Sequence, residues 1–232
     1  MTKIFADGIA ISSLEAYTSN PIIQGYTTNP SLIRTLGVTD YLGYVRDFLE
    51  RVPDKSVSVE ILTTENDAAI IREAKLLASL GANACIKIPV TDINGRMLGD
   101  SIKALVSEGL AVNVTAITSK TQILEAVGWL ENSELSFISV FAGRIADTGV
   151  DPSEYIDFAV KAAKVNTNIE VIWASPREIY NYIQAKENKC HVITMTEALI
   201  SKLKLLGKDL DQYSLETVKM FDEDAKKSNY RI

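Results

Sequence analysis

The chain has 232 residues, of which 47% are hydrophobic and 23% are charged, and its 24 Lys and Arg against 30 Asp and Glu give a net charge of −6. These proportions exclude disordered and collagen-like chains, and the acidic balance excludes general electrostatic attraction to nucleic acid or to anionic lipid. A single histidine, His191, excludes a His-rich metal site, and the apolar surroundings of Cys85 and Cys190 predict buried, reduced thiols. With no signal-peptide pattern and no apolar run of membrane-spanning length, we expect a cytoplasmic protein.

Short β-branched runs alternate with segments of helical periodicity along the chain. The eight predicted strands are Lys3–Ala6, Ile22–Tyr26, Val57–Ile61, Ala84–Val90, Ala111–Thr115, Leu135–Phe141, Glu170–Ala174 and Cys190–Thr194. Between them, apolar residues recur at three- and four-residue spacings, which is typical of amphipathic helices. The helices predicted most clearly are Asp67–Leu80, Thr118–Leu130, Ser153–Lys164, Thr196–Leu205 and Leu210–Lys226, with N-terminal caps at Ser119 and at Asp151-Pro152-Ser153.

Eight strands that alternate with about eight helices predict a (β/α)8 TIM barrel with one additional C-terminal helix. An open, doubly wound sheet is the alternative, but no GxGxxG motif follows any strand. No linker, repeat or shift in composition divides the chain. We therefore expect a single domain over residues 1–232, with residues 208–232 as a helical extension.

Lys87 is the strongest single indication of chemistry. It lies within an apolar strand, CIKIPV, whose two faces are both expected to be buried. Burial disfavours a charged amine and makes it a nucleophile toward a carbonyl carbon. A Schiff-base lysine and a lysine held in a structural ion pair both remain open at this point.

Active sites of such barrels lie at the C-terminal ends of the strands, and two carboxylates are expected there beside Lys87. Asp7 ends the first strand and Glu60 ends the third; a helix cap and a solvated strand end are their alternative roles. One amine and two carboxylates suffice for carbon–carbon bond chemistry at a ketone, without a metal.

The other polar strand ends fall into three groups. Arg144 and Arg177, beside Ser175, are either surface arginines or a clamp for a phosphate. The Thr27–Ser31 turn, with Thr28 and Asn29, either starts a helix or binds sugar hydroxyls. Asn113 and Thr115 share one face of the fifth strand, where they are able to position a hydroxyl or a water. His191 and Cys85 are interpreted as structural.

Six segments run in the order of a known family. They are Phe5-Ala6-Asp7, Gly25-Tyr26-Thr27-Thr28-Asn29-Pro30-Ser31, Ile86-Lys87-Ile88-Pro89-Val90-Thr91, Asn113-Val114-Thr115, Phe141-Ala142-Gly143-Arg144-Ile145 and Ala174-Ser175-Pro176-Arg177. Together they resemble the transaldolase family, in its short branch that includes the fructose-6-phosphate aldolases. The resemblance covers essentially the whole chain and implies no cofactor and no metal.

The resemblance implies a role for each matching residue. Lys87 would form a Schiff base with the donor ketose, and Asp7 would take the proton of its C4 hydroxyl as the C3–C4 bond breaks. Glu60 with Thr115 would hold the water used to form and hydrolyse the imine. Asn29, Asn113 and Ser175 would bind the dihydroxyacetone unit, and Arg144 with Arg177 would bind the distal phosphate. Thr28 and Phe141 complete the predicted substrate-binding residues.

Two positions favour transfer over simple cleavage. The aldolases of this family resemble a pattern with Gln at the position of Glu60 and Tyr at the position of Phe141. The predicted enzyme is therefore a class I transaldolase of the pentose phosphate pathway, which moves dihydroxyacetone from fructose 6-phosphate to an aldose phosphate such as erythrose 4-phosphate. A lyase of the same family and a non-catalytic sugar-phosphate-binding barrel are the alternatives. Val140 and Pro176 depart from the family pattern, and Pro176 affects how Arg177 is held.

The predicted helix over Leu210–Lys226 has apolar residues that a complete barrel does not need. Such a helix either folds back over the bottom of its own barrel or packs on a neighbouring subunit, since extra apolar surface is commonly buried between chains. Short transaldolase-like proteins form pentameric rings that pair into decamers, so the resemblance implies a homo-oligomer of five or ten chains.

Overall fold

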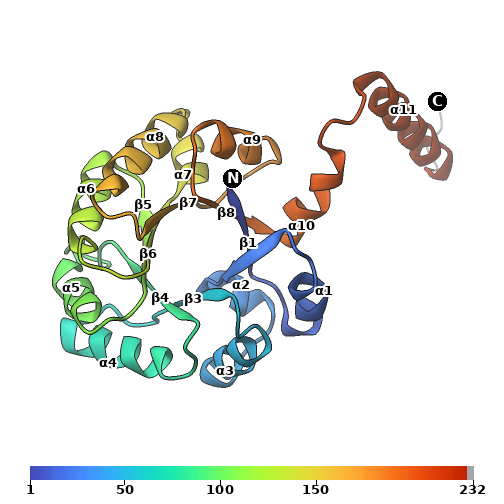
Figure 1. The fold of residues 1–232 in the computed structure, drawn as a ribbon. Coiled ribbons are helices and arrows are strands. Elements are labelled where there is room, and N and C mark those ends of the chain that lie inside the picture. The colour runs from blue at the N-terminus through green and yellow to red at the C-terminus, as the bar shows by residue number, and fades with distance from the viewer. Residues whose placement is uncertain (229–232) are drawn as a thin grey trace. The chain divides into compact units, whose positions relative to one another are not determined.

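Eight parallel strands close into a barrel in which each strand pairs with the next one along the chain, and the last pairs with the first (Figure 1). The computed structural model describes residues 1–228 and has two compact units, Met1–Ile200 and the segment from Ser201 onward. The strands are β1 Lys3–Asp7, β2 Ile23–Thr27, β3 Ser56–Glu60, β4 Ala84–Pro89, β5 Val112–Ile117, β6 Ser136–Val140, β7 Ile169–Trp173 and β8 Val192–Thr196. The predicted (β/α)8 barrel is confirmed.

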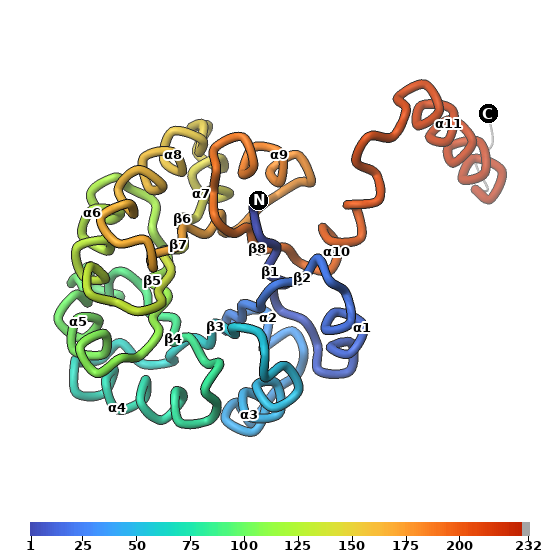
Figure 2. The backbone as a smooth tube through the Cα atoms, viewed as in Figure 1, coloured from blue at the N-terminus to red at the C-terminus, as the bar shows by residue number. Residues whose placement is uncertain are grey.

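Helices surround this ring of strands, and the backbone trace in Figure 2 follows their alternation with the strands. They are α1 Leu14–Thr18, α2 Pro30–Thr35, α3 Tyr41–Arg51, α4 Asp67–Ala78, α5 Gly99–Ser107, α6 Lys120–Trp129, α7 Ala142–Ala146, α8 Ser153–Ala162, α9 Tyr180–Glu187 and α10 Glu197–Ile200. Short 3-10 turns cover Ile11–Ser13 and Ala163–Val165.

Side-chain alternation along the strands separates the barrel interior from the helix layer. Outward-facing residues such as Val57 and Ile86 are buried beneath the helices. The inward-facing residues at mid-height form one apolar layer, in which the Phe5 and Phe137 rings meet edge to face at 5.7 Å. The members of this interior layer are Phe5, Cys85, Phe137, Ile172, Ala174 and Val192.

The helix starts follow the predicted caps. Ser119 and Gln122 form a reciprocal capping box at α6. At α8, Asp151 Oδ1 accepts a hydrogen bond from the Ser153 backbone N–H, and Pro152 takes the N-cap position. The carboxylate of the predicted turn thus satisfies the first N–H of the helix.

Several predicted boundaries differ from the structure by two residues or more, and two of these differences bear on how the barrel ends. The helix expected over Thr196–Leu205 is α-helical only to Ile200 and continues as 3-10 turns over Ser201–Leu205, where no residue is buried. The last strand begins at Val192, two residues later than expected, because Lys189 adopts a left-handed backbone with φ 54° that ends the preceding turn.

The N-terminal end of the barrel contains a polar layer beneath the interior layer. Lys3 Nζ lies 2.6 Å from Glu170 Oε1, and the Val171 backbone N–H donates to Nδ1 of His191 at 2.9 Å. Because Nδ1 accepts this bond, the ring must be neutral in the folded state. The structural interpretation of His191 therefore holds.

We expect His191 to make the stability of the protein depend on pH. Burial, with a smaller contribution from Lys3, lowers its pKa below the ordinary value against the opposing effect of Glu170. The unfolded chain therefore binds a proton first, so this stabilisation is complete above the unfolded pKa of about 6.5 and is lost as the pH falls through the lower folded value. His191→Asn keeps a hydrogen-bond acceptor but does not titrate. In urea titrations between pH 8 and pH 5, this variant should therefore lose less unfolding free energy than the wild type. Equal pH slopes would contradict this assignment.

The second unit contains α11, Leu210–Lys227, which begins at an N-cap where Asp209 Oδ1 accepts from the Gln212 N–H at 2.8 Å. The helix predicted over Leu210–Lys226 is confirmed, and Leu210, Val218 and Phe221 are among its exposed apolar residues. That these residues meet another copy in a pentamer or decamer stays a prediction, as does the single-domain assignment. None of the helices within residues 1–228 combines the length and apolar character needed to cross a membrane.

Candidate active site

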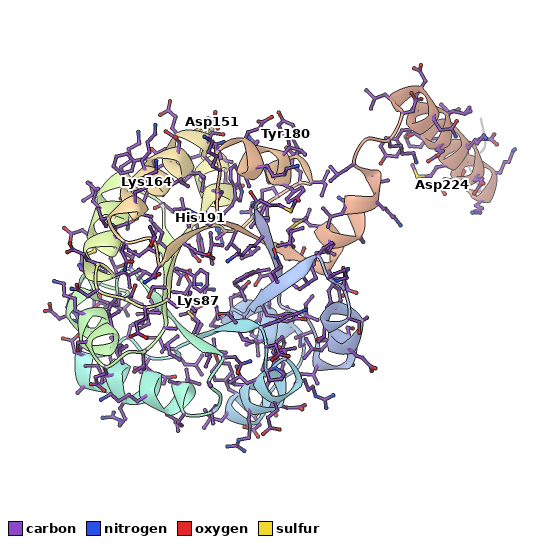
Figure 3. The ribbon with its side chains drawn as sticks, viewed as in Figure 1. Lys87, Asp151, Lys164, Tyr180, His191 and Asp224 are labelled. Carbon is purple, nitrogen blue, oxygen red and sulfur yellow. The ribbon has the colours of Figure 1, made fainter. Side chains whose placement is uncertain are left out.

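Lys87 lies on the inner face of β4, inside the ring of strands (Figure 3). Its neighbours Ile86 and Ile88 face the helix layer, and Lys87 itself is 6% exposed. Its Nζ lies 2.9 Å from Glu60 Oε2 and donates a hydrogen bond of 2.9 Å to the Thr28 carbonyl oxygen. A buried amine is therefore held in place by one carboxylate and one backbone carbonyl.

Glu60 and Asp7 end β3 and β1 on the same edge of the barrel. Glu60 is paired in register with Lys87 on the neighbouring strand. Asp7 Oδ1 accepts a hydrogen bond of 2.8 Å from the Thr27 hydroxyl. Burial raises the pKa of Asp7 above its usual value, and the Glu60 charge adds to this, while Lys87 and the Thr27 hydrogen bond oppose it. A carboxylate with a raised pKa is a stronger base, as a proton-transferring group requires.

A chain of hydrogen bonds crosses the interior between β6, β5 and β3. Ser139 Oγ donates to Asn113 Oδ1 at 2.8 Å, and Asn113 Nδ2 donates to Ser58 Oγ at 3.0 Å. The chain fixes the orientation of the Asn113 amide, which leaves its second N–H for a ligand. Two residues further along β5, Thr115 has a buried hydroxyl that bonds to none of the described residues.

The turn after β2 starts a helix. Asn29 Oδ1 accepts from the Leu32 N–H at 2.9 Å, and Pro30 occupies the first position of α2. The Thr28 hydroxyl donates to the Ser58 carbonyl oxygen at 2.9 Å. The side chains of both residues therefore have structural partners, while the Thr28 carbonyl holds Lys87.

The segments after β6 and β7 pack directly on each other. A Cβ added to Gly143 would lie 1.7 Å from the Ser175 carbonyl oxygen, so only glycine permits this approach. Ser175 has a left-handed backbone with φ 59°, and the half-buried Phe141 packs on the interior layer.

The two predicted phosphate-binding arginines are exposed at this same edge. Arg177 forms an ion pair with Asp147, at the end of α7, whereas Arg144 pairs with no carboxylate in residues 1–228. No group of three or more His, Cys, Asp or Glu side chains within that range is arranged to hold a metal ion.

The sequence interpretation missed two polar residues of the site, Ser58 and Ser139, whereas Thr27 lies in the Thr27–Ser31 turn that it had already singled out. Ser58 and Ser139 each lie on the inner face of their strand, two residues before or after a position that was considered. The period-two alternation that selected Lys87 would have found them, but single serines and threonines in strands are too common to stand out.

Comparison with known proteins decides the family. Residues 4–232 match the family model described as "Transaldolase/Fructose-6-phosphate aldolase". The chain belongs to this family. It is 32% identical over 202 residues to a protein of Sphingopyxis alaskensis named "Probable transaldolase", with 87% of this chain and 88% of that protein covered. It is 28% identical over 231 residues to a protein of the same name from Thermoanaerobacter sp., covering 99% of this chain and 100% of that one.

Solved structures share the fold at low sequence identity. A protein described as an aldolase superposes with a TM-score of 0.55 and 15% identity, covering 89% of this chain and 96% of that one. A second, titled a putative lyase/mutase from Burkholderia cenocepacia, gives a TM-score of 0.59 at 10% identity, over 88% of this chain and 79% of that one. At these identities the likeness establishes the barrel fold alone.

Proposed function

We propose that this member of the family is a class I transaldolase, which transfers a dihydroxyacetone unit from fructose 6-phosphate to an aldose phosphate such as erythrose 4-phosphate. The observation that supports the proposal most directly is the buried contact between Lys87 and Glu60, with Asp7 ending a strand on the same edge of the barrel. An amine in this setting gains its lone pair by passing a proton to the adjacent carboxylate.

The first half of the reaction builds the imine. The Lys87 amine adds to the donor ketone carbon, and the carbonyl oxygen leaves as water to form an iminium. Glu60, 2.9 Å from the Lys87 nitrogen, receives and returns the protons of this step, with Thr115 holding the water. Asn113, Asn29 and Ser175 bind the hydroxyls of the dihydroxyacetone unit.

The second half breaks and remakes a carbon–carbon bond. Asp7 takes the proton of the C4 hydroxyl, the C3–C4 electron pair moves toward the iminium nitrogen, and an aldose phosphate leaves behind an enamine. The enamine then attacks the acceptor aldehyde, and water hydrolyses the new imine. Arg144 and Arg177 bind the distal phosphate, Arg177 by exchanging part of its interaction with Asp147 for the ligand.

Borohydride trapping tests the covalent step. Reduction in the presence of fructose 6-phosphate should leave a stable amine adduct on Lys87 and inactivate the protein, because the iminium is the species that borohydride reduces. Peptide mapping by mass spectrometry locates the adduct. Lys87→Met should yield no adduct and no turnover; an unmodified Lys87 in the active wild-type protein would refute the Schiff-base mechanism.

Acceptor dependence tests transfer against cleavage. Phe141 has no hydroxyl with which to deliver a proton to the enamine, so the intermediate should wait for an aldehyde. Release of glyceraldehyde 3-phosphate from fructose 6-phosphate should therefore rise at least about tenfold when erythrose 4-phosphate is added. Glu60→Gln combined with Phe141→Tyr should reduce the ratio of the release rate with the acceptor to the release rate without it. Equal release with and without the acceptor would identify a lyase instead.

A further inference from the structure

We infer that Tyr41, assisted by Glu73, is a positioning residue that holds Glu60 against Lys87, an inference that rests on the function proposed above. Tyr41 is the first residue of α3, and its hydroxyl donates a 2.5 Å hydrogen bond to the backbone carbonyl oxygen of Glu60. Neither Tyr41 nor Glu73 lies at the C-terminal end of a barrel strand, since they belong to α3 and α4.

The need for Tyr41 follows from the way the β2–β3 ladder ends. The Thr28 N–H donates to the Ser58 carbonyl oxygen as the last bond between these strands. Bonds in a parallel ladder recur every second residue, so the next donor would be residue 30 and its acceptor the Glu60 carbonyl. Residue 30 is a proline, which has no N–H and already belongs to α2. Tyr41 supplies the missing donor.

Glu73 holds the backbone that directly follows Glu60. Its two carboxylate oxygens accept hydrogen bonds from the Leu62 and Thr63 N–H groups at 2.9 and 3.0 Å. The intervening Ile61 N–H donates to the carbonyl oxygen of Lys87 itself at 3.1 Å. Side chains from α3 and α4 thus fix the backbone at Glu60 and just after it, and Glu60 is the carboxylate that pairs with the amine.

This arrangement should affect one part of the reaction selectively. Glu60 acts in forming and hydrolysing the imine, so a displaced Glu60 slows those steps. Misplacing a catalytic group by a fraction of an ångström commonly costs an order of magnitude in rate. Tyr41→Phe should therefore reduce imine formation about tenfold, while the KM for fructose 6-phosphate changes less than about twofold.

A double-mutant cycle on the full chain separates positioning from general support of the fold. The rate of enaminone formation between Lys87 and pentane-2,4-dione reports on the amine without requiring turnover, since the amine condenses with the diketone and releases water. We expect Tyr41→Phe to slow this reaction about tenfold in the wild type but less than about twofold in the Glu60→Gln background. Glu73→Gln, which removes one of the two acceptors, should show the same dependence on Glu60.

Tyr44 provides a matched control on the same helix. Its hydroxyl also donates to a backbone carbonyl, that of Ile9, at 3.2 Å. Tyr44→Phe should change the rate by the same small factor in both backgrounds. If Tyr41→Phe and Glu73→Gln slow the reaction equally with Glu60 and with Gln at position 60, or not at all, the inference is overturned while the proposed function stands. A folded wild type that forms no enaminone at Lys87 overturns both.

Discussion

Gly143→Ala should be the most destabilising single substitution considered for this barrel. The added Cβ would lie 1.7 Å from the carbonyl oxygen and 2.8 Å from the carbonyl carbon of Ser175, which are backbone atoms that no rotamer change moves away. Relief requires α7 to separate from the end of β7, which displaces Ser175 and Arg177 together. We expect the free energy of unfolding in urea to fall by about 4 kcal/mol or more.

Gly128→Ala is the control for this experiment. Gly128 is also helical, but a Cβ there would meet no atom within 4 Å. Alanine should stabilise that position by about 0.5 to 1 kcal/mol, because glycine loses more backbone entropy in a helix. If both variants unfold at the same urea concentration as the wild type, the close approach of Gly143 to Ser175 is not a constraint on the fold.

Asp7→Asn should separate the two halves of the proposed reaction. Asparagine keeps the shape and can still accept from the Thr27 hydroxyl, but it cannot take a proton from the C4 hydroxyl. Borohydride should therefore still trap the intact donor ketose on Lys87, whereas aldehyde release should fall by about 10² to 10⁴. Quenched-flow measurement of the released aldehyde, paired with the intact mass of the trapped protein, follows both steps.

The pH profile gives a second measure of the same residue. Asp7 must be ionised to act as a base, and its pKa is raised by burial, so the acid limb of kcat should lie above the ordinary aspartate pKa of 3.8. The pH profile of the residual kcat of Asp7→Asn should lack this acid limb. Asp47→Asn, on the exposed face of α3, should leave both the rate and the profile as in the wild type. An Asp7→Asn variant with wild-type aldehyde release would remove Asp7 from the mechanism.

The fold was predictable because the strongest constraints on it are local. Strands such as β4 are buried on both faces, so their apolar runs stand out from the helical periodicity of segments such as α4. Lys87 was conspicuous for the same reason, as a charge in a buried run. The end of the last barrel helix was not predictable, because Leu203 and Leu205 continue the apolar spacing of a helix. The structure leaves both of these side chains only half-buried.

What the sequence could not reveal depends on contacts between distant segments. Tyr41 is an ordinary helix-start residue until the barrel brings its hydroxyl to Glu60, nineteen positions later. Ser175, which has a left-handed backbone, lies directly against Gly143, thirty-two residues earlier. Neither local composition nor hydrophobic periodicity can reveal a contact between residues so far apart in the sequence.

The interior layer also limits the order in which reactants can bind. Phe5, Phe137 and Ile172 are all almost completely buried across the middle of the barrel, and the Lys3–Glu170 pair lies beyond them. Lys87 can therefore be reached from one end only. In the proposed reaction, the aldose phosphate released from the donor would have to leave by the route through which the acceptor arrives. On the proposed chemistry, two sugar phosphates compete for that route, so turnover should follow a ping-pong sequence in which each substrate inhibits at high concentration by occupying the place of the other.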